Sequence, residues 1–168
     1  IQQFPNLSSL YVDRSGGIWV TGKNGYVFNY DPMQDTYRLA FHFPDSVKTN
    51  KRLPITHTYM DREDQLWLCT KNAQYIYHTQ QHTFSRIDSP INEEITFLTQ
   101  GKANEYFIGT NHNIYLAQLS GNSLTIKTNP LLENFHIIQH LYFHESTGSL
   151  LIGTHMDGFY LYDTQAAT

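Results

Sequence analysis

Apolar and polar residues alternate in short runs along the chain, and turns of small or polar residues separate the runs. At the start of the chain this pattern predicts strands A to D at residues 7–12, 18–21, 26–30 and 36–43. The turn between strands B and C contains Asn24-Gly25. Asn-Gly favours a tight hairpin because both residues accept positive φ angles. The pattern therefore predicts one four-stranded antiparallel unit.

The same unit recurs along the rest of the sequence. An aspartate stands six residues before a tryptophan in two copies, as Asp13 with Trp19 and Asp61 with Trp67. Phenylalanine and leucine take the tryptophan's place in the later copies, so the four anchor residues are Trp19, Trp67, Phe107 and Leu151. The anchors are 40 to 48 residues apart, which is the period of a β-propeller blade.

We therefore predict an all-β fold of β-propeller repeats, with about four four-stranded antiparallel blades that form part of a larger propeller. Residues 1–168 are interpreted as a single partial β-propeller domain, and its repeats are predicted at residues 7–43, 54–87, 94–128 and 137–163. The apolar residues of strand A are unevenly spaced, at Leu7, Leu10 and Val12, which predicts a bulge. The single cysteine, Cys69, lies in a continuously apolar B strand and is predicted to be a buried, unpaired thiol.

The two ends of the sequence complement each other. The fourth copy has no good D strand after residue 163, whereas residues 1–6 precede the first A strand, where a D strand belongs. We expect residues 1–6 to act as a closing strand for the last blade of a ring, in this chain or in a second copy. The chain begins without methionine, so we expect a piece of a longer protein. An arc of blades would expose the apolar sides of its end blades, which predicts a homodimer or edge-to-edge self-association.

Charge and motif content argue against several functions. The net charge is −4 and no Lys/Arg run exceeds Lys51-Arg52, which disfavours nucleic acid as a partner. No apolar run approaches about 18 residues, so we predict no membrane insertion by this segment. We find no nucleophile elbow, zinc-protease pair or phosphate loop. Paired carboxylates such as Asp61 with Glu63 and Glu93 with Glu94 fall in turns, where they bond to backbone amides. No catalytic residue and no cofactor is therefore predicted.

Three histidines recur every four residues, at His136, His140 and His144. On a helix they would share one face, but the segment aligns with strand A. The first and last would then lie far apart, because four residues of extended chain span about 13 Å. No metal site is predicted.

Loops of a propeller are the better place for recognition, because variable loops on a rigid scaffold commonly bind ligands. Amide and imidazole groups beside tyrosines suit sugars, which combine hydroxyl groups with a flat apolar face. The candidate ligand-binding residues in the B–C turns are Lys71, Asn72, His112, Asn113, His155 and Asp157.

The repeat is similar to a known family. The residues that carry the likeness in the first two copies are Leu7, Leu10, Asp13, Gly17, Trp19, Thr21, Gly25, Tyr30, Ile55, Asp61, Trp67, Thr70 and Tyr77. They resemble the two-component regulator propeller repeats in periplasmic sensor regions of Bacteroides-type hybrid two-component systems. The likeness covers the whole chain, and its motif specifies turns and packing, not a ligand.

The resemblance implies an extracytoplasmic ligand-sensing propeller segment of a hybrid two-component signalling protein. Such a protein would respond to an oligosaccharide and pass the signal to a histidine kinase through dimer rearrangement. The segment itself would not be an enzyme, and it would lie in the periplasm as part of an inner-membrane protein. Two alternatives stay open: a fragment of a propeller enzyme, such as a lyase or glycosidase, and a protein-binding propeller scaffold.

Overall fold

The computed structural model describes residues 7–22, 25–42, 55–71, 73–135 and 137–166. This part of the chain forms four antiparallel sheets, each with its strands side by side in chain order, which we call blades 1 to 4. Blade 1 contains β1 (Leu7–Val12), β2 (Ile18–Gly22), β3 (Tyr26–Asp31) and β4 (Thr36–His42). Blade 2 contains β5 (Ile55–Met60), β6 (Gln65–Thr70), β7 (Gln74–His78) and β8 (Thr83–Ile87). Blade 3 contains β9 (Phe97–Gln100), β10 (Glu105–Gly109), β11 (Ile114–Ser120) and β12 (Ser123–Leu132), and blade 4 contains β13 (Ile138–His144), β14 (Ser149–Thr154) and β15 (Phe159–Asp163).

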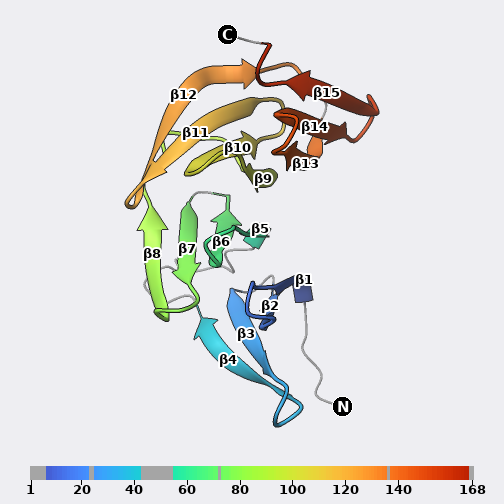
Figure 1. Ribbon diagram of the computed structural model, residues 1–168. Coiled ribbons are helices and arrows are strands. Elements are labelled where there is room, and N and C mark those ends of the chain that lie inside the picture. The colour runs from blue at the N-terminus through green and yellow to red at the C-terminus, as the bar shows by residue number, and fades with distance from the viewer. Residues whose placement is uncertain (1–6, 23–24, 43–54, 72, 136, 167–168) are drawn as a thin grey trace.

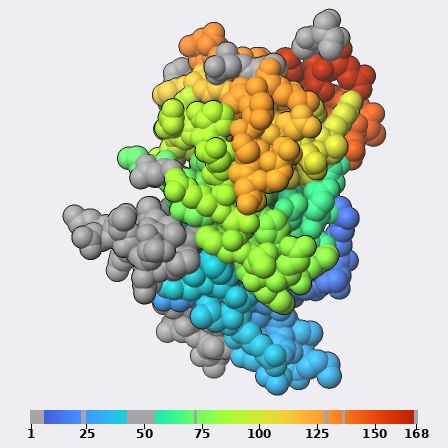
Figure 2. Space-filling view, turned by 90° about the vertical axis from the view of Figure 1, so that its left-hand side faces the viewer, coloured from blue at the N-terminus to red at the C-terminus, as the bar shows by residue number. Residues whose placement is uncertain are grey.

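The blades follow one another as a fan, as a propeller requires (Figure 1). The first strand of each blade is the innermost: β1 contacts β5, β5 contacts β9, and β9 contacts β13. The outer strands β4, β8 and β12 succeed one another on the opposite side of the molecule (Figure 2). The all-β propeller architecture is therefore confirmed. Among the described residues there is no helix long and apolar enough to cross a membrane.

The predicted strands of blade 1 agree with the observed ones to within one residue at each end. The predicted bulge in strand A is also present, because the pairing register shifts in β1, β5 and β13. In blade 3 the structure differs from the expectation, since β12 continues to Leu132 and the predicted repeat ends at residue 128. Pairing explains the extension: two register shifts let β12 follow β11 to its first residue, where Leu132 lies opposite Ile114. The predicted closing strand, residues 1–6, lies outside the described residues.

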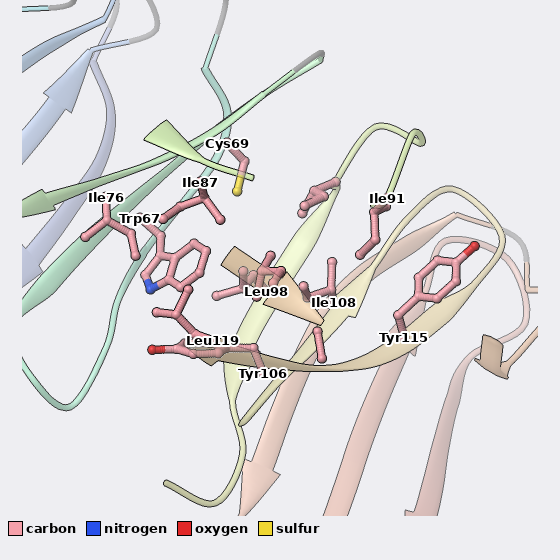
Figure 3. Packing of buried hydrophobic residues seen from close by; sticks show 13 residues of the cluster. Trp67, Cys69, Ile76, Ile87, Ile91, Leu98, Tyr106, Ile108, Tyr115 and Leu119 are labelled. Carbon is pink, nitrogen blue, oxygen red and sulfur yellow. The ribbon is translucent and has the colours of Figure 1, made fainter. Parts of the chain in front are cut away.

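Three hydrophobic cores hold the arc together, one between each pair of consecutive blades. Trp19, Trp67 and Phe107 are each at most 4% exposed, and each packs into the core shared with the following blade. Figure 3 shows Trp67 of blade 2 beside Tyr106 of blade 3, with ring centroids 4.7 Å apart. The fourth anchor, Leu151, is 39% exposed because it lies on the face of blade 4 that no described blade covers. The repeated anchor is therefore the residue that fastens each blade to the next.

Exposed large hydrophobic side chains of the described residues fall only on blades 1 and 4, or in turns next to their strands. On blade 4 they cross the sheet in one row, because Tyr142 lies opposite Leu151 and Leu151 opposite Leu161. Blades 2 and 3 have a neighbour on each side and bury the corresponding residues. The open faces of blades 1 and 4 thus carry exposed apolar side chains, as expected for an arc of blades.

Two glycines at equivalent strand ends test this inter-blade packing. A Cβ added at Gly109 would lie 2.9 Å from Cγ2 of Ile138 and 3.3 Å from Cδ1 of Leu141, in the core between blades 3 and 4. A Cβ at Gly153 would meet His140 at 3.4 Å, an ordinary contact. We expect Gly109→Ala to lower the free energy of unfolding by about 2 kcal/mol through overpacking. Gly153→Ala should change it by less than about 0.5 kcal/mol. Urea unfolding of both variants measures the difference, and equal losses would contradict this account of the interface.

Candidate ligand-binding groove

A groove of about 450 Å³ runs along the concave side of the arc and is lined by residues from the inner strands of all four blades. Its volume lies within the range of small-molecule sites. Aromatic side chains line it from β1, β5, β9 and β13, with Tyr11, Tyr59, Phe97 and Tyr142 among them. A second hollow of similar volume, about 490 Å³, lies beside the connection from blade 2 to blade 3. We favour the groove because it collects residues from every blade.

Arg62, in the turn after β5, joins three blades at one end of the groove. Its backbone N–H and its Nε donate to Oε1 of Gln100 in blade 3, over 2.8 and 3.1 Å. Its Nη2 donates to the carbonyl oxygen of Gly101, and its Nη1 lies 2.5 Å from Oε2 of Glu145 in blade 4. Gln100 is held in turn, since its Nε2 donates to Glu63 over 2.7 Å. The guanidinium is thus fixed by its neighbours.

Aromatic and imidazole rings form a row across the inner strands. His57 of β5 lies 4.3 Å from Phe97 of β9, and Phe97 lies 5.1 Å from His140 of β13, measured between ring centroids. The row follows from the bulges: His57 and His140 are the first residues of their strands to pair again after the register shift. The Tyr59 hydroxyl accepts a hydrogen bond from the backbone N–H of Gln100. These contacts give the groove a mainly apolar wall with hydroxyl groups at its edge.

His57 is partly buried, and its Nε2 is buried with no hydrogen-bond partner among the described residues. Burial, together with a smaller effect of His140 nearby, lowers the pKa of His57 from 6.5 to about 4, although a hydrogen bond with the backbone of Leu98 acts in the opposite direction. Between these two values the unfolded chain binds a proton that the folded chain does not, so His57 makes the fold less stable as the pH falls from about 6.5 towards about 4.

The ring of His57 packs beside that of Phe97 in the same row of rings. An aromatic ring without nitrogen should fit there too, so we expect His57→Phe to be tolerated. We predict that the variant loses less stability than the wild type when urea unfolding is repeated at a pH of about 5 instead of about 7. Carboxylates titrate in both proteins, so the difference between the two isolates His57. An identical loss in both would contradict the prediction.

The six-residue spacing of aspartate and tryptophan, which recurs in blades 1 and 2, has a direct structural cause. Oδ2 of Asp61 accepts the indole N–H of Trp67 over 3.1 Å and the hydroxyl of Tyr106 over 2.9 Å. Its Oδ1 accepts the backbone N–H groups of Glu63 and Gln65. Burial raises the pKa of Asp61, although these hydrogen bonds act in the opposite direction. The prediction that Asp61 caps a turn is confirmed, and its bonds to the indole and to blade 3 were not anticipated.

Asp13 repeats the arrangement in blade 1. It accepts the indole N–H of Trp19 over 2.7 Å and the backbone N–H groups of Ser15 and Gly17. Asp13 is much less buried. Burial still acts to raise its pKa, but the hydrogen bonds together outweigh it and leave the pKa below its usual value. The aspartate of the same motif therefore has a raised pKa in blade 2 and a lowered pKa in blade 1.

The five candidate residues from the B–C turns that the structure describes do not line the groove. Asn72 lies outside the described residues, and Lys71 is exposed at the turn between β6 and β7. His112 bonds through Nδ1 to the carbonyl oxygen of Phe135, and His155 bonds to the side chain of Gln139. The remaining two, Asn113 and Asp157, lie in the turns of blades 3 and 4. Each turn belongs to a different blade, so their role in ligand binding stays a prediction.

The paired carboxylates mainly hold loops. Glu93, in the connection from blade 2 to blade 3, accepts hydrogen bonds from Thr110 over 2.7 Å, from Asn113 over 3.2 Å and from the Tyr115 hydroxyl. Burial acts to raise the pKa of Glu93, but these hydrogen bonds outweigh it and lower the pKa. Asn113 is thereby engaged within the protein.

Cysteine and histidine show no sign of metal chemistry in the part of the chain described. Cys69 is a free, fully buried thiol, as predicted, and burial raises its pKa to about 12. His140 and His144 lie on strand β13, His144 bonds to Thr147, and His136 lies outside the described residues. Within the described ranges, no group of three His, Cys, Asp or Glu side chains is placed to hold a metal ion.

No protein-family model and no curated protein matches the sequence. Solved structures match its fold. The extracellular domain of BT4673 from B. thetaiotaomicron, assigned to a hybrid two-component system, covers 93% of this chain with a TM-score of 0.70 and 17% identity. The corresponding domain of BT3049 from B. thetaiotaomicron covers 95% with a TM-score of 0.65 and 15% identity. A streptogramin B lyase covers 99% with a TM-score of 0.66 and 11% identity.

These likenesses establish a β-propeller fold. The chain spans 20% and 21% of the two extracellular domains and 58% of the lyase. It therefore corresponds to a part of each of these proteins, and the lyase differs in function from the other two.

Proposed function

We propose that this chain is an extracytoplasmic, periplasmic segment of a hybrid two-component sensor, and that it binds an oligosaccharide along the groove on its inner strands. The observation that carries the proposal is the groove itself, which is lined by aromatic side chains from all four blades together with hydroxyl groups. Apolar pockets with a few placed polar groups are typical ligand sites. The fold shared with two extracellular domains of B. thetaiotaomicron supports the choice of a sensor.

A signal would reach a histidine kinase through a change in the arrangement of a dimer. A ligand shifts such an equilibrium only by its difference in affinity for the two arrangements. The inner strands suit this coupling, because a ligand in the groove touches all four blades at once and Arg62 already links three of them.

A lyase is the second candidate, favoured by the likeness to streptogramin B lyase. Incubation with candidate oligosaccharides, followed by product analysis, separates the two functions. A sensor segment leaves the sugar intact, whereas a lyase yields unsaturated products.

Isothermal titration against a panel of plant and host oligosaccharides tests the groove, using both this chain and the intact extracellular region. We choose Tyr142→Ala as the variant because Tyr142 lines the groove and is 59% exposed, so its truncation costs little stability. Tyr160→Ala is the matched control, since Tyr160 belongs to the same blade but not to the groove. We expect Tyr142→Ala to weaken binding about tenfold or more and Tyr160→Ala to leave it unchanged. Binding that neither variant alters would refute the groove as the site.

We also propose self-association through the open face of blade 4, where Leu161 is 67% exposed beside Leu151. Sedimentation velocity of this chain should show a concentration-dependent dimer. Leu161→Lys should abolish the dimer, and Gln118→Lys, on an exposed position of β11, should not. A monomer at all concentrations would contradict the proposal.

A further inference from the structure

The charges that line the groove neutralise each other. Among the described lining residues, Arg62 is the only cation at neutral pH and Glu145 the only acid. Nη1 of Arg62 and Oε2 of Glu145 are 2.5 Å apart, and the pair connects blade 2 to blade 4. His57, the imidazole in the lining, is held uncharged at pH 7 because burial lowers its pKa to about 4. The groove therefore presents no free charge to a ligand.

Three of the five N–H donors of the guanidinium are already engaged within the protein. Each of its three nitrogens already donates within the protein: Nε to Gln100, Nη2 to Gly101 and Nη1 to Glu145. Arginine recognises carboxylate, sulfate or phosphate groups through paired N–H donors in a fixed fork. An acidic ligand at the two remaining N–H groups would lie beside the Glu145 carboxylate, which would repel it.

We propose that the groove selects neutral oligosaccharides and rejects those that carry uronate or sulfate groups. This inference rests on the proposed function, because it names the class of sugar that the same site takes. Rejection follows from the Arg62–Glu145 pair, since discrimination often depends on what an unwanted ligand would leave unpaired. Selection follows from the aromatic wall and from neutral hydroxyl groups in the lining, those of Tyr59, Thr99 and Tyr142.

The test uses this chain and the intact extracellular region, and it titrates each with two panels of hexasaccharides. One panel is neutral (glucans, mannans, xylans and galactans), and the other is acidic (galacturonates and sulfated galactans). We expect binding from the neutral panel alone. Tighter binding from the acidic panel would overturn the inference and leave the proposed function standing. Failure of every sugar to bind to either protein would overturn the proposed function and, with it, this inference.

A second measurement examines the ion pair without any sugar, with inorganic sulfate as the titrant. Glu145→Gln keeps the size of the side chain and releases the guanidinium, so we expect its affinity for sulfate to rise about tenfold or more, the worth of one charge-assisted hydrogen bond. The double variant Arg62→Gln/Glu145→Gln should lose this gain. Glu105→Gln is the matched control, because Glu105 forms a 2.5 Å pair with Lys127 outside the groove. Equal sulfate affinity in the wild type and in Glu145→Gln would overturn the inference.

Discussion

Replacing Trp67 by alanine is expected to lower the free energy of unfolding by about 4 kcal/mol, within the range for large aromatic residues in cores. Trp67 is fully buried and lies between blades 2 and 3, where it packs against Tyr106. Its removal leaves a cavity in the largest core and deprives Asp61 of the indole donor. Urea unfolding followed by circular dichroism measures the loss, since the fluorescence of Trp67 itself disappears with the substitution.

The matched control is Leu151→Ala, at the corresponding anchor of blade 4. Leu151 faces the open side of the arc, so we expect its truncation to cost less than about 1 kcal/mol at protein concentrations too low for the proposed dimer. A loss at Leu151 comparable to that at Trp67 would mean that blade 4 packs against a partner even at these concentrations. A small loss at Trp67 would contradict the view that the anchors hold consecutive blades together.

The strands of this chain were predictable because the signals that specify them are local. Alternating apolar residues and turns such as Asn24-Gly25 determine where a strand begins and ends, and the uneven spacing in strand A revealed its bulge. The end of β12 was missed because it depends on pairing with β11, which lies outside the segment itself. The exposure of Leu151 likewise depends on which blade face is left uncovered, and nothing in its own strand reveals this.

The groove could not be read from the sequence, because it forms from residues of four strands that are distant along the chain. Tyr11 and Glu145 line the same hollow although more than a hundred residues separate them. The variability of loops favoured the B–C turns as the place for ligand binding, whereas the groove lies on the innermost strands. One signal was present: the first strand of each blade faces the axis of a propeller, and those strands carry Tyr59, Phe97 and Tyr142.

The spacing of Asp61 and Trp67 was recognised as a repeat, but its physical meaning appeared only in three dimensions. A six-residue separation places the aspartate across the turn from the indole ring, so that one carboxylate binds both the turn and the tryptophan. Because Tyr106 also donates to Asp61, the motif links the turn of blade 2 to blade 3. The repeat thus encodes contacts between blades as well as the turn.

We expect Asp61→Asn to lower the free energy of unfolding by about 3 kcal/mol, because a buried donor would lose its acceptor. An asparagine can satisfy the backbone N–H groups of Glu63 and Gln65 with its oxygen, as Oδ1 of Asp61 does now. Its amide NH₂ would then face the indole N–H of Trp67, and two donors cannot bond to each other. The Tyr106 hydroxyl can rotate and accept, but the indole cannot.

Asp13→Asn is the matched control, because Asp13 makes the same bond to an indole in a much less buried site. Water can reach the groups that this substitution leaves unpaired, so the loss should be about 1 kcal/mol. Urea unfolding at pH 7 compares the two variants. The pKa of Asp61 is raised in the folded protein. The free energy of unfolding therefore falls as the pH rises from the ordinary pKa of an aspartate to the raised pKa of Asp61. Equal losses at Asp61 and Asp13 would show that burial between blades does not set the strength of this bond.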